Sequence, residues 1–354
     1  MNFTFTEDQL LFQESVRDFL VNEVTAESIR ALWEVDTGRS DALWQQLTEL
    51  GLTAMTVPEA MGGLGMTALD FILIAQECGY VALPAPLVHI ALVAVPLLDQ
   101  LSGDSGEAIK QQWLPAIAEG RAKVMVGLEQ NFFVEDAHTA DLLILQKGQA
   151  LYALTPEQFS YTLNESVDPS RKLYSISWQT SDANLIAEGG QAQCLIDGAM
   201  NRGALGVAAE ALGLSQRMVD MTVSYTADRQ QFGKPIGSFQ AVKHLMANVA
   251  VKLEFAKTPV YKAAYAVAEQ LSSANVNVSH AKLAATEVAQ LAARNAMQCH
   301  GAMGYTWEVD LQIFMKKAWV YNNAWGVVAW HQGRVSDFVF ADQAAIGPGS
   351  TFVA

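Results

Sequence analysis

The sequence predicts a mainly α-helical protein with a small β-domain between two helical regions. Apolar residues recur at helical spacing through most of the first 120 residues, and again from about Met200 onward. Between these regions, short apolar runs are separated by turn residues, which is typical of strands. At 354 residues the chain can hold two or three domains. We therefore expect an N-terminal helical domain at 1–120, a small β-domain at 121–197 and a C-terminal helical bundle at 198–354.

The N-terminal region begins with a capped amphipathic helix. In "TEDQLLFQESVRDFLVNEV", Thr6 is a candidate N-cap and the apolar residues follow a helical period. The stretch "SDALWQQLTELGL" repeats this pattern and stops at Gly51. Proline and three glycines mark "TVPEAMGGLGM" as a loop. Residues 67–101 are apolar almost all round, which predicts one helix buried within a bundle.

The middle region changes its period to that of strands. The predicted strands lie in "KVMVGLEQ", "DLLILQKGQALYALT", "RKLYSISW" and "AQCLIDG", and "KGQ" is a hairpin signal.

Helices are expected to return near Met200 and to continue through 239–272, 277–300 and 308–341. Their wide apolar stripes indicate a bundle and an oligomer.

Composition excludes several classes of function. The net charge of −15 argues against nucleic-acid binding, because no basic face stands out. Three widely spaced cysteines lack metal-ligand spacing, so we expect no metal site and a reducing compartment. The N-terminus lacks signal-peptide features, and the most apolar run, 87–98, is too short to span a bilayer. A cytoplasmic protein without a membrane span is the expectation.

The stretch "RQQFGKPIGSFQ" joins two long helical patterns and carries an unusual set of side chains. Arg229 offers a planar fork for phosphate oxygens, Phe232 offers a face for an aromatic ring, and Gly233 lets the backbone approach closely. Gln240 follows at the entry to the next helix. A lone Arg at a helix end is usually a surface C-cap, but the combination predicts a phosphate-bearing aromatic cofactor.

A second stretch, "QCHGAMGY", ends one predicted helix and opens the next. Gln298 can donate and accept hydrogen bonds, and Gly301 and Gly304 leave main-chain N–H groups bare near a helix end, which suits phosphate or ribose. An ordinary C-cap turn is the alternative interpretation, and His300 is expected to be a packing residue. The glycine-rich "VPEAMGGLG" at 57–65 is interpreted as an interhelical turn.

Together, these stretches resemble the acyl-CoA dehydrogenase family. "FTEDQLLFQESVRDF" resembles its opening helix, "GLTAMTVPEAMGGLGM" its first-domain loop, and "RQQFGKPIGSFQAVKHLMA" with "QCHGAMGY" its two FAD-contact segments. The resemblance implies an acyl-CoA dehydrogenase-like fold that ends in a four-helix bundle, and FAD lying at a subunit interface. It also implies which residues face another subunit's FAD: Arg229, Phe232, Gln240, Gln298, Gly301 and Ala302.

The sequence departs from the family at the catalytic base. The family places a Glu before a glycine about twenty residues beyond the GxxG turn, whereas this chain has Trp325 before Gly326. Tryptophan cannot take a proton. The alternative family position corresponds to Gly203, which is also without a carboxylate, and Glu210 lies two turns further along the same predicted helix. The identity of the base is therefore unknown.

The predicted β-domain departs as well. Where the family has Thr-Glu-Pro and a long strand series against the flavin ring, this chain keeps Leu128-Glu129-Gln130 before a shortened run. A short chain without the base resembles the smaller subunit of the heteromeric acyl-CoA dehydrogenases of steroid side-chain breakdown.

Three hypotheses follow from the resemblance. The first is a subunit that completes the FAD site of a catalytic partner in a tetramer built as a dimer of dimers. The second is a homo-oligomeric dehydrogenase that uses an unusual base such as Glu210, and the third is a non-catalytic binding homologue. For the first two, the resemblance implies an acyl-CoA thioester as substrate and an electron-transfer flavoprotein or similar acceptor. The acyl chain stays open.

Overall fold

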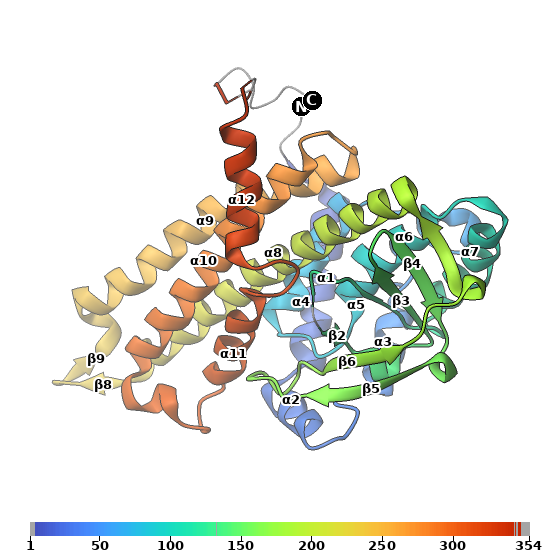
Figure 1. The fold of residues 1–354 in the computed structure, drawn as a ribbon. Coiled ribbons are helices and arrows are strands. Elements are labelled where there is room, and N and C mark those ends of the chain that lie inside the picture. Colours follow the sequence, from blue (N-terminus) through green and yellow to red (C-terminus); the bar gives the residue numbers. More distant parts are fainter. Residues whose placement is uncertain (1–3, 132, 343, 345, 348–354) are drawn as a thin grey trace. The chain divides into compact units, whose positions relative to one another are not determined.

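Helices make up most of the chain and strands form a smaller part, as the sequence predicts (Figure 1). The computed structural model describes residues 4–131, 133–342, 344 and 346–347. The chain divides into two units. The first contains residues 4–26, 72–83 and the described residues from 207 onward, and the second contains 27–71 and 84–206. Each unit is described by itself.

The first unit is helical apart from one short hairpin. Its elements are α1 (Glu7–Glu23), most of α4 (Ala68–Tyr80), the later half of α8 (Gly189–Asp228), β8 (Gln230–Gln231), β9 (Lys234–Pro235), α9 (Gln240–Ala268), α10 (Ala274–His300), α11 (Leu311–Tyr321) and α12 (Val328–Val339). Two short 3-10 turns, Ile236–Ser238 and Gly301–Tyr305, belong with these elements.

Helix α1 begins at the predicted N-cap. The Thr6 hydroxyl accepts a hydrogen bond from the Gln9 main-chain N–H at 3.2 Å, and the Gln9 side chain accepts one from the Thr6 N–H at 2.8 Å. This capping box satisfies two N–H groups that the first helical turn leaves without partners. The prediction that the next amphipathic pattern stops at Gly51 is also confirmed, because α3 ends at Glu49 and Gly51 has φ of +76°.

Small residues let the helices of the first unit pack closely. A Cβ at Gly213 of α8 would lie 1.8 Å from the Gln76 main-chain oxygen of α4, so only glycine fits there. Alanines cover much of the buried face of α10, including Ala285, Ala289 and Ala292. Short side chains at these positions allow main chains to approach, and the contact area then excludes water along the whole helix length.

The second unit combines short helices with two small sheets. Its helices are α2 (Ala26–Trp33), α3 (Asp41–Glu49), α5 (Leu87–His89), a π-helical turn (Ile90–Ala94), α6 (Val95–Asp99), α7 (Gly103–Ala118) and the first half of α8. Its strands are β1 (Val124–Gly127), β2 (Val134–Glu135), β3 (Leu142–Lys147), β4 (Ala150–Leu154), β5 (Phe159–Asn164), β6 (Leu173–Trp178) and β7 (Leu185–Glu188).

The two sheets have different strand orders. One sheet runs β1-β3-β4-β7, with β1 parallel to β3 and the other pairs antiparallel. The other runs β2-β6-β5 and is antiparallel throughout. The predicted "KGQ" hairpin is confirmed, because Lys147 pairs with Ala150 across Gly148, whose φ is +59°.

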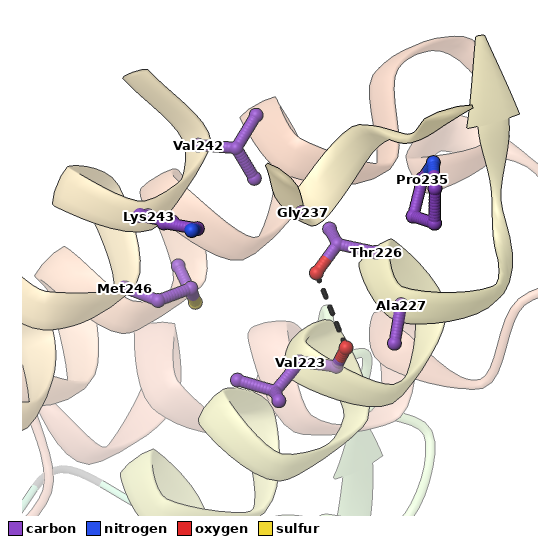
Figure 2. A pocket seen from close by; sticks show the side chains of 8 residues that line it. All are labelled: Val223, Thr226, Ala227, Pro235, Gly237, Val242, Lys243 and Met246. Atoms are coloured by element: carbon purple, nitrogen blue, oxygen red, sulfur yellow. Dashed lines mark hydrogen bonds between the residues drawn. The ribbon is translucent and has the colours of Figure 1, made fainter. Parts of the chain in front are cut away.

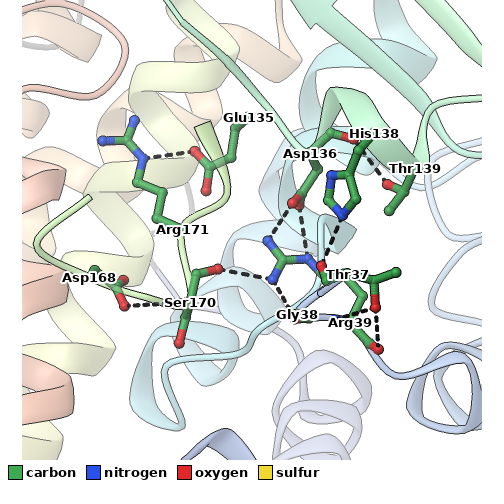
Figure 3. A network of polar contacts seen from close by, with 10 residues as sticks. All are labelled: Thr37, Gly38, Arg39, Glu135, Asp136, His138, Thr139, Asp168, Ser170 and Arg171. Carbon is green, nitrogen blue, oxygen red and sulfur yellow. Dashed lines mark hydrogen bonds and ion pairs between the residues drawn. The ribbon is translucent and has the colours of Figure 1, made fainter. Parts of the chain in front are cut away.

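A buried ion pair fixes the loops beside the smaller sheet (Figure 3). Arg39 donates to both carboxylate oxygens of Asp136 and to the main-chain oxygens of Gly38 and Ser170. Both charged side chains are almost fully buried. Because all of these acceptors face one guanidinium, the loop after α2 is held against the strand end at Asp136 and the turn at Ser170.

Two sequence predictions about the elements are wrong. Residues 67–101 do not form one helix, because α4 ends at Tyr80 and the chain turns at Ala82 (φ +54°) before two prolines. "AQCLIDG" is not a strand but lies within α8; a short apolar run does not distinguish the two by periodicity. The long apolar pattern at 308–341 contains two helices, α11 and α12, with a turn between them. The sequence also missed β5 and β7. The bounds of the three domains stay predictions.

Candidate functional site

The hairpin of β8 and β9 projects from the end of α8 (Figure 1). Arg229 follows the last residue of α8; its N–H donates to the Tyr225 oxygen at 2.9 Å, and its own oxygen accepts from the Ile236 N–H at 2.8 Å. The two turn residues, Phe232 and Gly233, have φ of +54° and +76°. Two left-handed residues in a two-residue loop form the type I′ turn that suits the twist of a hairpin.

Phe232 is strained and exposed at the same time. The residue is 92% exposed, and its ring makes an edge contact with Phe239 at a centroid distance of 6.1 Å. A left-handed backbone costs a bulky residue on the order of 1–3 kcal/mol, whereas glycine or asparagine would adopt it cheaply. The hairpin therefore presents an aromatic ring to the outside at a cost in stability, which is typical of a binding residue.

The second predicted segment ends α10. Gly301 caps the helix with φ of +60°, and Gln298, Gly301 and Ala302 are exposed. His300 is buried, and its Nδ1 donates to the Ala296 oxygen at 2.8 Å. Burial lowers the pKa of His300. These contacts identify His300 as the packing residue that the sequence predicts.

A ring stack joins the two segments. The rings of Tyr225 and His300 are 4.2 Å apart and nearly parallel, and the Tyr225 hydroxyl donates to the His300 main-chain oxygen at 3.4 Å. Arg229 lies one helical turn beyond Tyr225, and Gln298 lies two residues before His300. The hairpin and the C-terminal end of α10 therefore meet at one end of the first unit (Figure 1). Gln240, exposed at the first position of α9, belongs to the same end.

A pocket of about 310 Å³ lies beneath the hairpin (Figure 2). It is lined by Val223, Thr226, Ala227, Pro235, Gly237, Val242, Lys243 and Met246. The Thr226 hydroxyl donates to the Val223 main-chain oxygen at 3.1 Å. Sequence reasoning missed this pocket. The available signal was the small size of Ala227 and Gly237, which leaves space where three elements converge.

A buried lysine holds the turn between α11 and α12. Lys282 of α10 is 1% exposed, and its Nζ donates to the main-chain oxygens of Tyr321 and Ala324, both at 2.8 Å. An ammonium at the C-terminal end of a helix satisfies carbonyls that have no helical partner and interacts favourably with the helix dipole.

His331 completes the hold on this turn. It is fully buried, its Nε2 donates to the Trp325 main-chain oxygen at 2.9 Å, and its Nδ1 lies 3.1 Å from the Ser279 hydroxyl. Burial, reinforced by the charge of Lys282, lowers the pKa of His331 to about 4. The neutral ring donates at Nε2 and accepts from Ser279 at Nδ1. Trp325 stands in this turn with a left-handed backbone, φ of +53°.

Comparison with known proteins identifies the family. The family patterns described as "Acyl-CoA dehydrogenase, N-terminal domain" and "Acyl-CoA dehydrogenase, C-terminal domain" match residues 6–121 and 194–336. The chain is 31% identical to acyl-CoA dehydrogenase IpdE2 of Mycobacterium tuberculosis, over 88% of this chain and 91% of that protein. The chain belongs to the acyl-CoA dehydrogenase family. It is therefore an oxidoreductase that acts on acyl-CoA, as the sequence predicts.

Two solved structures share the acyl-CoA dehydrogenase fold. Butyryl-CoA dehydrogenase from Megasphaera elsdenii superposes with a TM-score of 0.82 at 22% identity, over 96% of this chain and 100% of that one. The ChsE4–ChsE5 complex from Mycobacterium tuberculosis gives 0.83 at 20% identity, over 96% and 100%. At these identities the likeness concerns the fold alone.

The acyl-CoA dehydrogenase family is a family of flavoproteins, and the end of the bundle suits part of FAD. The Arg229 guanidinium can pair with phosphate oxygens, the exposed main chain at Gly301 and Ala302 can approach them, and the Phe232 ring can contact an aromatic ring. These are four of the six residues that the sequence singled out, and all six, Gln240 and Gln298 included, are exposed. Their donor set fits the phosphate and adenine end of the dinucleotide.

The segment around Leu128 resembles the flavin-ring segment of the acyl-CoA dehydrogenases, and three of its polar groups have partners within the chain. The Val126 N–H donates to His89 Nε2 at 3.0 Å, and the Glu129 N–H donates to the Gln146 side chain at 3.0 Å. The Glu129 carboxylate accepts from the Gly148 N–H at 2.8 Å. Leu128 is buried and has no hydroxyl. The Val126 and Glu129 N–H groups are therefore not available as donors to the ring end of FAD.

Neither candidate position for the family's base carries an available carboxylate. Trp325 lies in the turn between α11 and α12 that Lys282 and His331 hold. A Cβ at position 326 would lie 2.8 Å from His331 Nε2, so the packing requires glycine after Trp325. Gly203 lies within α8. Glu210 lies on the part of α8 that faces α4, where its charge raises the pKa of the Cys78 thiol in addition to the larger effect of burial.

Two further findings concern the described residues only. No helix among them is long and apolar enough to cross a membrane. In the same part of the chain, no group of three or more His, Cys, Asp or Glu side chains could hold a metal ion.

Replacing Phe232 with Gly should raise the free energy of unfolding of the free chain by about 1 kcal/mol. Relief of left-handed strain exceeds the entropic cost of glycine. The same change should weaken flavin retention in the assembled oligomer, because the exposed ring is removed. Urea unfolding and flavin content measure the two effects. Phe255→Gly is the control, since Phe255 is 76% exposed on the regular helix α9 and should lose stability instead. Equal losses in both variants would contradict the strain argument.

Proposed function

We propose that this chain is the subunit of a FAD-dependent acyl-CoA dehydrogenase that lends FAD contacts to a catalytic partner. In this proposal Arg229 pairs with the pyrophosphate of the neighbouring chain's FAD. Gln298, Gly301 and Ala302 supply polar and main-chain contacts, and Gln240 and Phe232 border the adenine end. FAD, when bound, supplies the hydride acceptor for α,β-desaturation of the acyl-CoA thioester.

One observation carries the proposal. The two segments that suit a dinucleotide phosphate are joined by the Tyr225–His300 stack and point outward, whereas the family's base position holds Trp325. A site that the chain completed for itself would need a carboxylate near the reacting Cα–H. The internal hydrogen bonds of the Val126 and Glu129 N–H groups give further support, because these donors are then not available to a flavin ring bound by this chain.

The names of similar proteins are consistent with a catalytic partner subunit. The relative IpdE2 is named as an acyl-CoA dehydrogenase, and one structure with the same fold is a complex of two proteins, ChsE4 and ChsE5. We therefore propose a hetero-tetramer built as a dimer of dimers, with an electron-transfer flavoprotein or similar acceptor. The resemblance to the steroid dehydrogenases favours a bulky acyl group. A cytoplasmic location is part of the same proposal.

Particular residues argue against each of the two alternatives. A homo-oligomeric enzyme would need Glu210 as its base, but this residue lies on the α4-facing side of α8. A non-catalytic binding homologue would leave the exposed Arg229 and Gln298 without a purpose.

The purified chain alone should oxidise acyl-CoA at least 10²–10⁴-fold more slowly than the assembled oligomer, because general-base catalysis contributes roughly that factor. The measurement is reduction of an artificial electron acceptor by the chain alone, and by the oligomer purified with its partner. Turnover by the chain alone at the rate of the oligomer would reject the partner-subunit proposal. If Glu210→Gln then abolished that turnover, the homo-oligomeric alternative would replace it.

A further inference from the structure

The pocket beneath the hairpin has apolar walls on three sides (Figure 2). Val223 and Ala227 come from α8, Pro235 from β9, and Val242 and Met246 from the first turns of α9. Its volume of about 310 Å³ is at the lower end for a small-molecule site. A pocket of this kind favours a ligand with an apolar body.

Polar recognition in the pocket comes from one charged group. The Lys243 amine points into the space between α9, Gly237 and Thr226 (Figure 2). In the described part of the chain its ammonium has no hydrogen-bond or ion-pair partner. The Thr226 hydroxyl uses its proton on Val223, so it can only accept from a ligand. Lys243 is an exposed residue, so its ammonium is hydrated in the free chain, and an anion with an apolar remainder would replace that water while covering the apolar walls.

We propose that this pocket binds a small amphipathic monoanion, a medium-chain fatty acid or a similar monocarboxylate. Its carboxylate would pair with Lys243 and its hydrocarbon part would cover Val223, Val242 and Met246. A nucleotide phosphate fits less well, because the remaining lining offers no second charge and few donors. The site is separate from the exposed face of Arg229 and Gln298, and the inference does not depend on the proposed function.

Occupancy has a physical consequence for the neighbouring segment. Pro235 and Gly237 belong to the return strand and turn of the same hairpin that carries Arg229 and Phe232. A ligand that packs between this return segment and α8 would restrict the motion of the hairpin. Carboxylates of this class are released when acyl thioesters are hydrolysed, so the site would take a compound related to the enzyme's substrates.

The test is isothermal titration calorimetry of the purified chain with octanoate, and with octan-1-ol and octylamine as uncharged and cationic analogues. Octanoate should bind saturably and more tightly than either analogue. Lys243→Met should weaken octanoate binding about ten- to a hundredfold, as expected for a lost charged hydrogen bond. Ala227→Leu should abolish it by filling the pocket. Matched controls on exposed positions of α9, Lys262→Met and Ala247→Leu, should leave it unchanged.

Several results would overturn the proposal. These are the absence of saturable octanoate binding, equal binding of octylamine, or binding that survives both pocket variants. If octanoate bound the free chain but not the assembled oligomer, the natural occupant would be a side chain of the partner, and the small-molecule site would be rejected. Thermal midpoints of all variants show that each is folded. Because the titration needs no flavin, its outcome is independent of whether Arg229 holds FAD.

Discussion

Replacing Lys282 with Met should lower the free energy of unfolding by about 2–4 kcal/mol. Methionine keeps the apolar stem but removes both hydrogen bonds, which leaves the carbonyls of Tyr321 and Ala324 buried without their donor. Each such orphaned group costs about 1–3 kcal/mol. The change also removes the cost of burying an ammonium, so the net loss is smaller than the sum of two full penalties. The turn that carries Trp325 should open first.

Urea unfolding of Lys282→Met beside wild type measures the loss. Lys252→Met is the matched control, because Lys252 is half-exposed and pairs with the exposed Glu287 on the surface. A surface pair of this kind contributes at most about 1 kcal/mol. If both variants lost the same stability, the hydrogen bonds of Lys282 would not stabilise the α11–α12 turn. A fluorescence change that disappears in Trp325→Phe would locate the opening at this turn.

Arg229→Ala should weaken flavin retention in the assembled oligomer by tens-fold or more. Truncating one partner of a desolvated charge pair typically costs about 2–5 kcal/mol, since the phosphate is left buried and uncompensated. Arg229 is exposed in the single chain, and among the residues that the structure describes no carboxylate pairs with its guanidinium. The stability of the free chain should therefore change little, and the loss should concern the cofactor.

Flavin stoichiometry after gel filtration, together with the thermal midpoint of the free chain, tests this expectation. Arg121→Ala is a suitable control, because Arg121 is an exposed arginine that pairs with Glu119. Unchanged flavin content in Arg229→Ala would remove the assignment of this end of the bundle to FAD. A lowered thermal midpoint of the free chain would instead mean that Arg229 supports the hairpin.

Local features of the fold could be predicted wherever the signal lies within a few residues. The Thr6 cap and the turn at Gly148 depend on neighbours two to four positions away, and both are confirmed. The break after Tyr80 and the break at Trp325 were missed, although prolines and a glycine follow them. Each break is hard to detect in the sequence because the apolar pattern continues on both sides of it. The buried helices before and after the break have the same composition.

By itself the sequence determined the helical character, the family and the residue types available at each motif, because these depend on side-chain chemistry and spacing along the chain. Only the tertiary structure decided which groups meet. The stack of Tyr225 on His300 joins residues 75 positions apart, and Lys282 reaches carbonyls 39 and 42 positions away. The pocket at Lys243 likewise exists because α8, the hairpin and α9 converge. Contacts of this kind form when helices pack to bury apolar surface, and no local pattern specifies which polar groups then lie opposite one another.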